Sequence, residues 1–198
     1  MQKKSKAETI NRSYFEPTGF RSVDGEGNER KFELTFSSEE PYKRWFGDEV
    51  LDHSEGCGNL ERLNSIGCLL FNHNRDDVVG KILRAWISDG KGHAEVEFDT
   101  DERSEIIYQK VKNGTLKATS FAYRVGVWED VKAGENSSDG RFKGPISIAK
   151  SWTAMEISIV TVPADATVGV GRNEQKEENP LDWYEKQIQV NKNKMGGF

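Results

Sequence analysis

The sequence predicts a small α+β domain in which short strands form a barrel-like or sandwich-like core. Short apolar or alternating segments recur between residues 32 and 161, and turn residues separate them. Only one segment has a clear helical pattern, and residues 129–144 form a long polar loop. Many short strands, one good helix and one long loop are typical of a small α+β domain of this kind.

The first expected strand lies around residues 32–36. Phe32, Leu34 and Phe36 alternate with polar or charged residues, which indicates a strand with one buried face. A hairpin loop is predicted at residues 88–92, where two glycines stand beside Asp89. The remaining strand candidates are residues 66–71, 78–87, 94–98, 115–128 and 152–161.

One helix is predicted between Asp99 and Asn113. Asp99 and Glu102 have the spacing of an acidic capping box, and an apolar stripe follows them. Asn113-Gly114 then supplies a left-handed stop. We expect this helix to lead directly into the strand at 115–128.

Composition excludes several classes of protein. The formal net charge is −5, so we expect no nucleic acid as the main ligand, because phosphate binding needs a basic surface. No apolar run reaches the roughly 18–20 residues of a membrane span. The basic N-terminus has no apolar segment after it, so no secretory signal is expected. Cys57 and Cys68 are interpreted as unpaired thiols of a soluble intracellular protein.

The chain is expected to hold one domain with two polar ends. Residues 1–20 lack periodicity and are interpreted as a flexible leader. Residues 21–172 contain the predicted strands and helix. Residues 173–198 are a highly charged C-terminal tail.

Three polar residues interrupt apolar segments and together suggest acyl-transfer chemistry. Ser120 lies in the strand candidate 115–128 between Ala118 and Ala122, on the face with the smaller side chains. A serine hydroxyl needs a base, and His73 directly follows the apolar run 66–71. Glu156 stands among apolar neighbours and should need a partner, which an imidazole N–H can provide. Nucleophile, base and orienting acid indicate a serine protease.

The same residues also allow other interpretations. Each of the three alone is compatible with an ordinary structural role, and Glu156 could pair with a lysine or arginine instead. His53 is a candidate accessory residue, and His93 is interpreted as a surface residue. Asp76 and Asp77 compete with Glu156 as the acid that orients His73.

No cofactor and no metal are expected, because the three histidines are single residues in unrelated contexts. A metal-dependent hydrolase that uses His73 with Asp76 and a second histidine is the weaker enzymatic alternative.

Several motifs resemble the prohead (procapsid) maturation proteases of tailed bacteriophages, over roughly residues 12–172. The similarity begins with Phe32-Glu33-Leu34-Thr35-Phe36 and Arg44-Trp45-Phe46-Gly47, and continues through Glu49-Val50-Leu51-Asp52-His53. It is most specific at Leu70-Phe71-Asn72-His73-Asn74, at Gly114-Thr115-Leu116-Lys117-Ala118-Thr119-Ser120-Phe121 and at Glu156-Ile157-Ser158-Ile159-Val160-Thr161-Val162-Pro163-Ala164. These three segments stand in the family's order, with a helix ahead of the serine strand.

The resemblance implies a serine endopeptidase with Ser120 as nucleophile and His73 as base. The family is held to share the herpesvirus assemblin fold, so it implies a mostly antiparallel β-barrel surrounded by a few helices. In that fold the third triad member is a second histidine, and Glu156 stands at the corresponding position here. By analogy, the oxyanion-hole donors are sought near Val162 to Asp165.

The resemblance also implies partners and a location. The expected substrates are scaffold or the N-terminal extension of the major capsid protein, and the enzyme is expected to cleave itself. The expected location is the interior of the immature capsid in the host cytoplasm, and a homodimer is expected by analogy. The alternative is a non-catalytic capsid-assembly module that keeps the protease fold.

Overall fold

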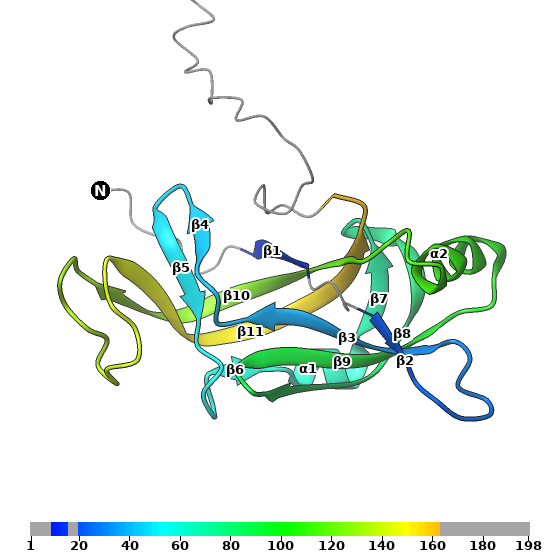
Figure 1. The fold of residues 1–198 in the computed structure, drawn as a ribbon, viewed down its shortest axis with the longest axis horizontal. Coiled ribbons are helices and arrows are strands. Elements are labelled where there is room, and N and C mark those ends of the chain that lie inside the picture. The colour runs from blue at the N-terminus through cyan, green and yellow to red at the C-terminus, as the bar shows by residue number, and fades with distance from the viewer. Residues whose placement is uncertain (1–8, 16–19, 163–198) are drawn as a thin grey trace, which may run out of the picture. The chain divides into compact units, whose positions relative to one another are not determined.

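A computed structural model describes residues 9–15 and 20–162 of the chain (Figure 1). One twisted sheet dominates the described part, and most of its ladders are antiparallel. The strands are β1 (Ile10–Phe15), β2 (Phe20–Ser22), β3 (Lys31–Ser38), β4 (Tyr42–Arg44), β5 (Gly47–Leu51), β6 (Gly58–Asn59), β7 (Cys68–Phe71), β8 (Asn74–Ser88), β9 (Lys91–Phe98), β10 (Ala118–Val131) and β11 (Ile146–Val160). The helices are α1 (Glu61–Ile66) and α2 (Glu102–Lys112).

The order along the sheet is β1-β10-β11-β7-β8-β9-β3-β2, and β4, β5 and β6 lie off this path. In the described part of the chain, no backbone ladder joins the outer strands β1 and β2, so the sheet is open and the predicted barrel is not found. The sheet still curls enough for the Thr119 hydroxyl on β10 to donate to the Thr35 carbonyl on β3, at 2.8 Å. A side-chain contact of this kind brings two strands together but does not replace a ladder.

The long strand β11 organises the sheet because three short strands pair with it in parallel. β5, β6 and β7 meet successive parts of β11, while β10 runs antiparallel along it for almost its whole length. Parallel neighbours cannot be joined by a tight turn, so this arrangement brings segments together that are distant in sequence. β7 therefore ends beside Ser158 and Ile159 of β11, which follow Glu156 closely along the strand.

The core lies on the inner side of this curled sheet. Tyr123, Phe121 and Trp152 are among the largest fully buried side chains, and Phe121 stacks on Tyr123 with ring centroids 4.9 Å apart. The predicted bulky face of the 115–128 strand is thus largely buried, but Val127 is 53% exposed. Register shifts on both sides of Val127 interrupt the alternation of side chains, which explains the exception.

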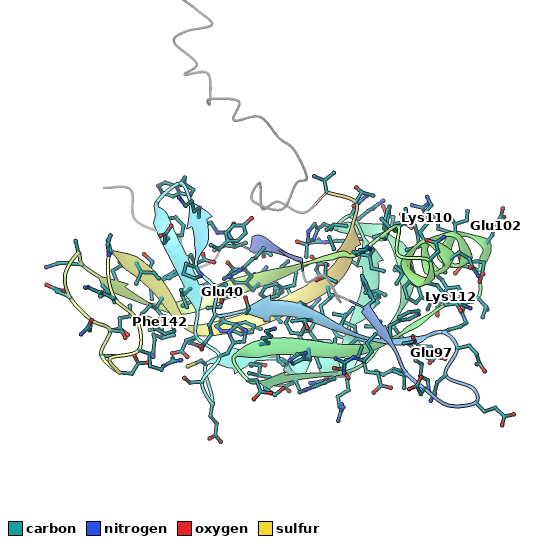
Figure 2. All side chains as sticks on the ribbon, viewed as in Figure 1. Glu40, Glu97, Glu102, Lys110, Lys112 and Phe142 are labelled. Carbon is teal, nitrogen blue, oxygen red and sulfur yellow. The ribbon has the colours of Figure 1, made fainter. Side chains whose placement is uncertain are left out.

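Helix α2 is where the sequence predicts a helix, but its cap is different. The N-cap is Asp101, whose side chain accepts a hydrogen bond from the Ser104 amide at 3.0 Å; Asp99 lies outside the helix. Gly114 has a φ of 75° and supplies the expected left-handed stop. Glu102 begins the helix and Lys112 ends it, as the helix dipole favours (Figure 2). Helix α1 is short and was not predicted from the sequence.

The structure corrects two other predictions, on where the polar loop begins and on the N-terminal segment. The polar loop begins after Val131 rather than at residue 129, because β10 continues to Val131 opposite Ile146. Part of the expected leader is a strand, since Ile10–Phe15 pairs with β10. An edge strand of this kind is held by backbone hydrogen bonds and needs no alternating apolar pattern. The tail 173–198 lies outside the described residues.

Candidate active site

His73 stands at the tip of the β7–β8 hairpin, in a two-residue turn. Phe71 pairs with Asn74, and the residues between them, Asn72 and His73, have φ values of 51° and 59°. Two left-handed residues define a type I′ turn, which matches the twist of the flanking strands. Asparagine tolerates this conformation, whereas histidine adopts it at some cost. The turn therefore fixes the direction in which the imidazole leaves the backbone.

The turn is tied to the end of β11 on both sides. The Asn72 amide donates to the Ile159 carbonyl at 2.8 Å, and the Thr161 amide donates to Asn72 Oδ1 at 3.0 Å. These bonds satisfy polar groups of a strand end and hold the hairpin tip against β11. The position of His73 thus depends on the register between β7 and β11.

His73 connects Ser120 and Glu156 through its two ring nitrogens. Nε2 lies 2.7 Å from Ser120 Oγ, and Nδ1 lies 2.5 Å from Glu156 Oε1. In the neutral imidazole with a proton on Nδ1, this nitrogen donates to the carboxylate and Nε2 accepts from the hydroxyl. A carboxylate in this position also stabilises the imidazolium that forms when the hydroxyl loses its proton. The three residues have the geometry of a Ser–His–acid triad.

Ser158 forms hydrogen bonds with both the base and the acid. The His73 amide donates to Ser158 Oγ at 3.1 Å, and the Ser158 hydroxyl donates to Glu156 Oε2 at 2.8 Å. Glu156 and Ser158 are two residues apart on β11 and so share a face of the strand. Each Glu156 oxygen therefore has a fixed partner, and the carboxylate cannot rotate away without breaking both bonds.

The Ser120 hydroxyl has two acceptors and only one proton. It lies 2.7 Å from His73 Nε2 and 3.0 Å from the Arg12 carbonyl oxygen on β1. Ser120 is 0% exposed, while the His73 and Glu156 side chains are 26% and 20% exposed. The candidate nucleophile is thus covered by β1 on one side, and the base and acid face a more open region.

That open region is a cavity of about 570 Å³ beside the triad. His73 and Glu156 line it, together with Thr9 and three arginines. The three arginines are Arg62, Arg75 and Arg124. Arg124 Nε donates to Thr9 Oγ1 at 2.9 Å, so the residue before β1 is attached to one wall of the cavity.

A family model described as Caudovirus prohead serine protease matches residues 32–180, which is more than half of the chain. The chain belongs to this family. The family resemblance that the motifs around His73, Ser120 and Glu156 indicate is therefore confirmed.

Two further similarities accompany the family match. The chain is 33% identical over 145 residues to a major capsid protein of Halomonas phage phiHAP-1. The matched segment covers 71% of this chain and 23% of that protein, so the chain spans less than a quarter of the relative's length. Among solved structures, the bacteriophage T4 capsid assembly protease gp21 is similar with a TM-score of 0.47 and 8% identity, over 79% of this chain and 98% of that one.

His53, the candidate accessory residue, is engaged elsewhere in this family member. Its Nε2 lies 2.8 Å from Ser37 Oγ and its Nδ1 lies 2.8 Å from the Leu51 carbonyl, and its ring packs on Trp152. Burial lowers the pKa of His53 below its ordinary value, with the nearby charge of Arg12 adding to this effect. These contacts lie at the carboxyl end of β5, away from the turn that joins β4 to β5.

Two other residues considered for the site, Asp77 and His93, also have partners outside the triad. Arg103 holds both carboxylate oxygens of Asp77, at 3.0 and 2.6 Å. His93 stacks on Trp86 with ring centroids 5.6 Å apart. Within residues 9–15 and 20–162, no group of three His, Cys, Asp or Glu side chains is arranged to hold a metal ion. No helix in those ranges is long and apolar enough to cross a membrane.

Sequence reasoning missed three residues that shape the site. Ser158 could have been recognised from its spacing, because residues two apart on a strand share a face with Glu156. Asn72 carried a signal too, since asparagine before a histidine between two strands is compatible with a left-handed turn. The sequence contains no signal for the role of the Arg12 carbonyl, because nothing within β1 indicates which strand β1 pairs with. Of the segment proposed for the oxyanion hole, only Val162 lies within the described residues.

Proposed function

We propose that the chain is a serine endopeptidase of phage capsid maturation. The observation that carries the proposal is the pair of contacts made by His73, with Ser120 Oγ on one ring nitrogen and Glu156 Oε1 on the other. Membership of a prohead serine protease family supports the same reaction class. We assign the protease domain to residues 21–172 and the tail to residues 173–198, with β1 of the preceding segment 1–20 added to the sheet of that domain.

In this proposal Ser120 Oγ attacks the carbonyl carbon of a peptide bond while His73 Nε2 takes the hydroxyl proton. His73 then gives that proton to the leaving amine as the carbon–nitrogen bond breaks, which leaves an acyl group on Ser120. Water attacks the acyl-enzyme with His73 again as base, and the hydroxyl is restored. Glu156 keeps the imidazole in the required tautomer and stabilises its protonated form.

The proposed substrates are scaffold or the N-terminal extension of the major capsid protein, and the chain itself. A relative with a segment 33% identical to part of this chain is named a major capsid protein, which supports a capsid protein as partner. The proposed location follows from the substrates: the enzyme acts inside the immature capsid within the host cell. A homodimer is proposed by analogy with assemblin-type enzymes only.

One observation favours a second candidate function, a non-catalytic assembly module. Ser120 is completely buried and β1 lies over it, so a peptide cannot reach the hydroxyl in this conformation. A module of this kind would bind the capsid or scaffold protein and leave it intact. Cleavage therefore has to be measured together with association.

The test is co-expression of the full chain with the major capsid protein, followed by intact mass spectrometry of both proteins. We expect defined shortening of one or both chains with wild type and none with Ser120→Ala. Ser151→Ala is a matched control, because Ser151 is an exposed serine on β11 that should not affect cleavage. Labelling of Ser120 by a fluorophosphonate gives an independent readout of its nucleophilicity.

The outcomes separate the two candidates. Cleavage that is lost in Ser120→Ala and kept in Ser151→Ala supports the protease. Association of intact proteins in all three cases supports the assembly module. Equal cleavage by wild type and Ser120→Ala contradicts the assignment of Ser120 as nucleophile.

A further inference from the structure

Strand β1 lies along the edge of the strand that contains Ser120. It lies beside β10 (Figure 1) and pairs with it in antiparallel register. Arg12 stands opposite Phe121, and Ser13 stands opposite Ser120. β1 is the outermost strand of the sheet, so it has a ladder partner on one side only. Binding of an extended segment to a sheet edge is a common way for proteins to hold peptides. β1 thus lies where an extended substrate would be held next to Ser120.

The register presents one particular carbonyl group to the serine. The Arg12 carbonyl oxygen lies 3.0 Å from Ser120 Oγ. Its carbon is bonded to that oxygen at about 1.23 Å, so the carbon lies no more than about 4.2 Å from Oγ. Attack requires about 3–3.5 Å, so a shift of roughly 1 Å or less is enough. The Arg12–Ser13 bond is therefore next to the nucleophile.

The Arg12 side chain occupies a buried site between β1 and the β4–β5 hairpin. Arg12 is only 2% exposed. Its Nη2 donates to the carbonyl of Glu40, which lies between β3 and β4 (Figure 2). Its guanidinium lies over the Tyr42 ring, 5.2 Å from the ring centroid. The buried carboxylate of Glu49 on β5 attracts this cation. A carbonyl, an aromatic face and a carboxylate are the partners that a guanidinium prefers.

The residues that precede Arg12 in the sequence also contact the site and the core. Ile10 is partly buried and packs against the core, and Thr9 lines the cavity that His73 and Glu156 also line. Arg124 holds the Thr9 hydroxyl, as described above. The segment 9–12 is thus anchored by three side chains on the amino-terminal side of the Arg12–Ser13 bond. In a protease this is the side of the substrate that becomes the acyl group.

We propose that β1 is bound as a substrate, that the chain cleaves its own Arg12–Ser13 bond, and that the site formed by Glu40, Tyr42 and Glu49 selects a basic residue at the same position in other substrates. This inference rests on the proposed function, because it requires Ser120 and His73 to act as nucleophile and base. It specifies the substrate class: extended peptides with arginine or lysine immediately before the cleaved bond.

The covalent step balances without any further reactant than water. Ser120 Oγ forms a bond to the Arg12 carbonyl carbon, and the bond from that carbon to the Ser13 nitrogen breaks. The Ser120 proton passes through His73 to the Ser13 amine. Hydrolysis then gives a carboxylate on Arg12 and restores the Ser120 hydroxyl. Departure of residues 1–12 frees the part of the β10 edge from Phe121 to Tyr123 for another extended segment, while Ser13–Phe15 stay paired with β10.

The site contains one buried carboxylate for two guanidinium groups. Arg44 Nε lies 3.4 Å from Glu49 Oε2, and Arg12 is the second cation. In the described part of the chain, Arg12 Nη1 has no hydrogen-bond partner, so one donor group of this buried side chain is not satisfied. An incompletely satisfied buried cation costs free energy. A segment bound in this way is able to leave after cleavage.

The first experiment follows the intact mass of purified full-length protein over time. We expect wild type to lose residues 1–12 and begin at Ser13, with a first-order rate that does not depend on protein concentration, because β1 belongs to the same chain. Ser120→Ala should keep its full mass. Arg12→Glu should slow this cleavage by at least about 100-fold, because a carboxylate would face Glu49. Arg12→Lys should stay within about tenfold of wild type. Arg21→Ala, at an exposed arginine on β2, is the matched control and should cleave normally.

A second measurement removes any effect of folding. The protein, after its self-cleavage has gone to completion, is given a synthetic peptide with the sequence of residues 8–17, or the same peptide with alanine in place of arginine. We expect kcat/KM for the arginine peptide to be at least about tenfold higher, since the enzyme is identical in both assays.

The possible failures are distinguishable. If the wild type cleaves the capsid protein while its Arg12–Ser13 bond stays intact, the inference is overturned and the proposed function stands. Equal cleavage of the two peptides overturns the basic-residue preference. If no substrate is cleaved and Ser120 is not labelled by a fluorophosphonate, the proposed function itself fails and the inference fails with it.

Discussion

Ser120 and Ser158 are paired residues of the β10–β11 ladder. One lies 2.7 Å from the imidazole of His73, and the other holds the amide of the same residue at 3.1 Å. Ala122 stands opposite Glu156 in the next same-face position, where its small side chain leaves room for the imidazole and the carboxylate to meet. The antiparallel register of two strands thus sets the relative positions of nucleophile and acid, and Ser158 attaches the backbone of the base to the same ladder.

Ser158→Ala tests whether this serine positions the site. The substitution removes the acceptor for the His73 amide and the donor to Glu156, and we expect kcat for peptide cleavage to fall about 10–100-fold with little change in KM. The free energy of unfolding should fall by about 1–3 kcal/mol, because buried polar groups lose partners. Steady-state kinetics and urea unfolding measure both. Ser151→Ala on the same strand is the control. A loss of stability with unchanged kcat would assign Ser158 a structural role only.

Glu156→Gln keeps the shape of the acid and removes its charge. The imidazolium that forms during attack loses its carboxylate partner, and the amide can favour the other tautomer of His73. We expect the fold to persist, judged by circular dichroism, and kcat to fall by on the order of 10²–10⁴-fold. Activity within a few-fold of wild type would show that Glu156 does not orient the base.

Asn72→Ala and Asn72→Gly separate the backbone of the turn from its side-chain bond. Both lose the acceptor for the Thr161 amide, but only alanine resists the left-handed conformation at φ 51°. We expect Asn72→Ala to be less stable than Asn72→Gly by about 1 kcal/mol in urea unfolding, and less active. Equal stability of the two variants would indicate that the turn is not held in this conformation in solution.

The stability of the protein should decrease in mild acid because of His53. Burial lowers the pKa of this group, so between the ordinary value of about 6.5 and the lower folded value the unfolded chain binds more protons. The free energy of unfolding should therefore be fully maintained above about pH 6.5. It should fall at up to about 1.4 kcal/mol per pH unit as the pH drops below that value.

Urea titrations at several pH values measure this dependence, and His53→Gln should flatten it below pH 6.5. His93→Gln provides the control, because His93 is a partly buried histidine on β9 with a different environment. The same slope in wild type and His53→Gln would assign the acid sensitivity to other groups.

Strands with a strong local pattern could be predicted, and weaker elements could not. The alternation of Phe32, Leu34 and Phe36 marks β3, and the turn at Asp89-Gly90 has φ values of 52° and 69°, as a predicted hairpin loop requires. Helix α1 has only six residues, too few for a helical pattern to stand out. Whether a curved sheet closes depends on ladders between distant strands, which no local pattern encodes.

The sequence by itself determined which residues are the candidates for the chemistry. His73, Ser120 and Glu156 stand out because a polar side chain beside strand-like sequence needs a reason, and their order along the chain matches a family motif. It also determined most strands, since alternating apolar residues require a sheet with a buried face.

Only the tertiary structure decided how these residues meet and what covers them. The contacts of His73 depend on the parallel pairing of β7 with β11, and the role of Ser158 depends on the register of β11 with β10. The placement of β1 over Ser120 depends on a free strand edge far away in the sequence. Backbone hydrogen bonds between strands are nearly independent of side-chain identity, so pairing partners are selected by the packing of the whole sheet.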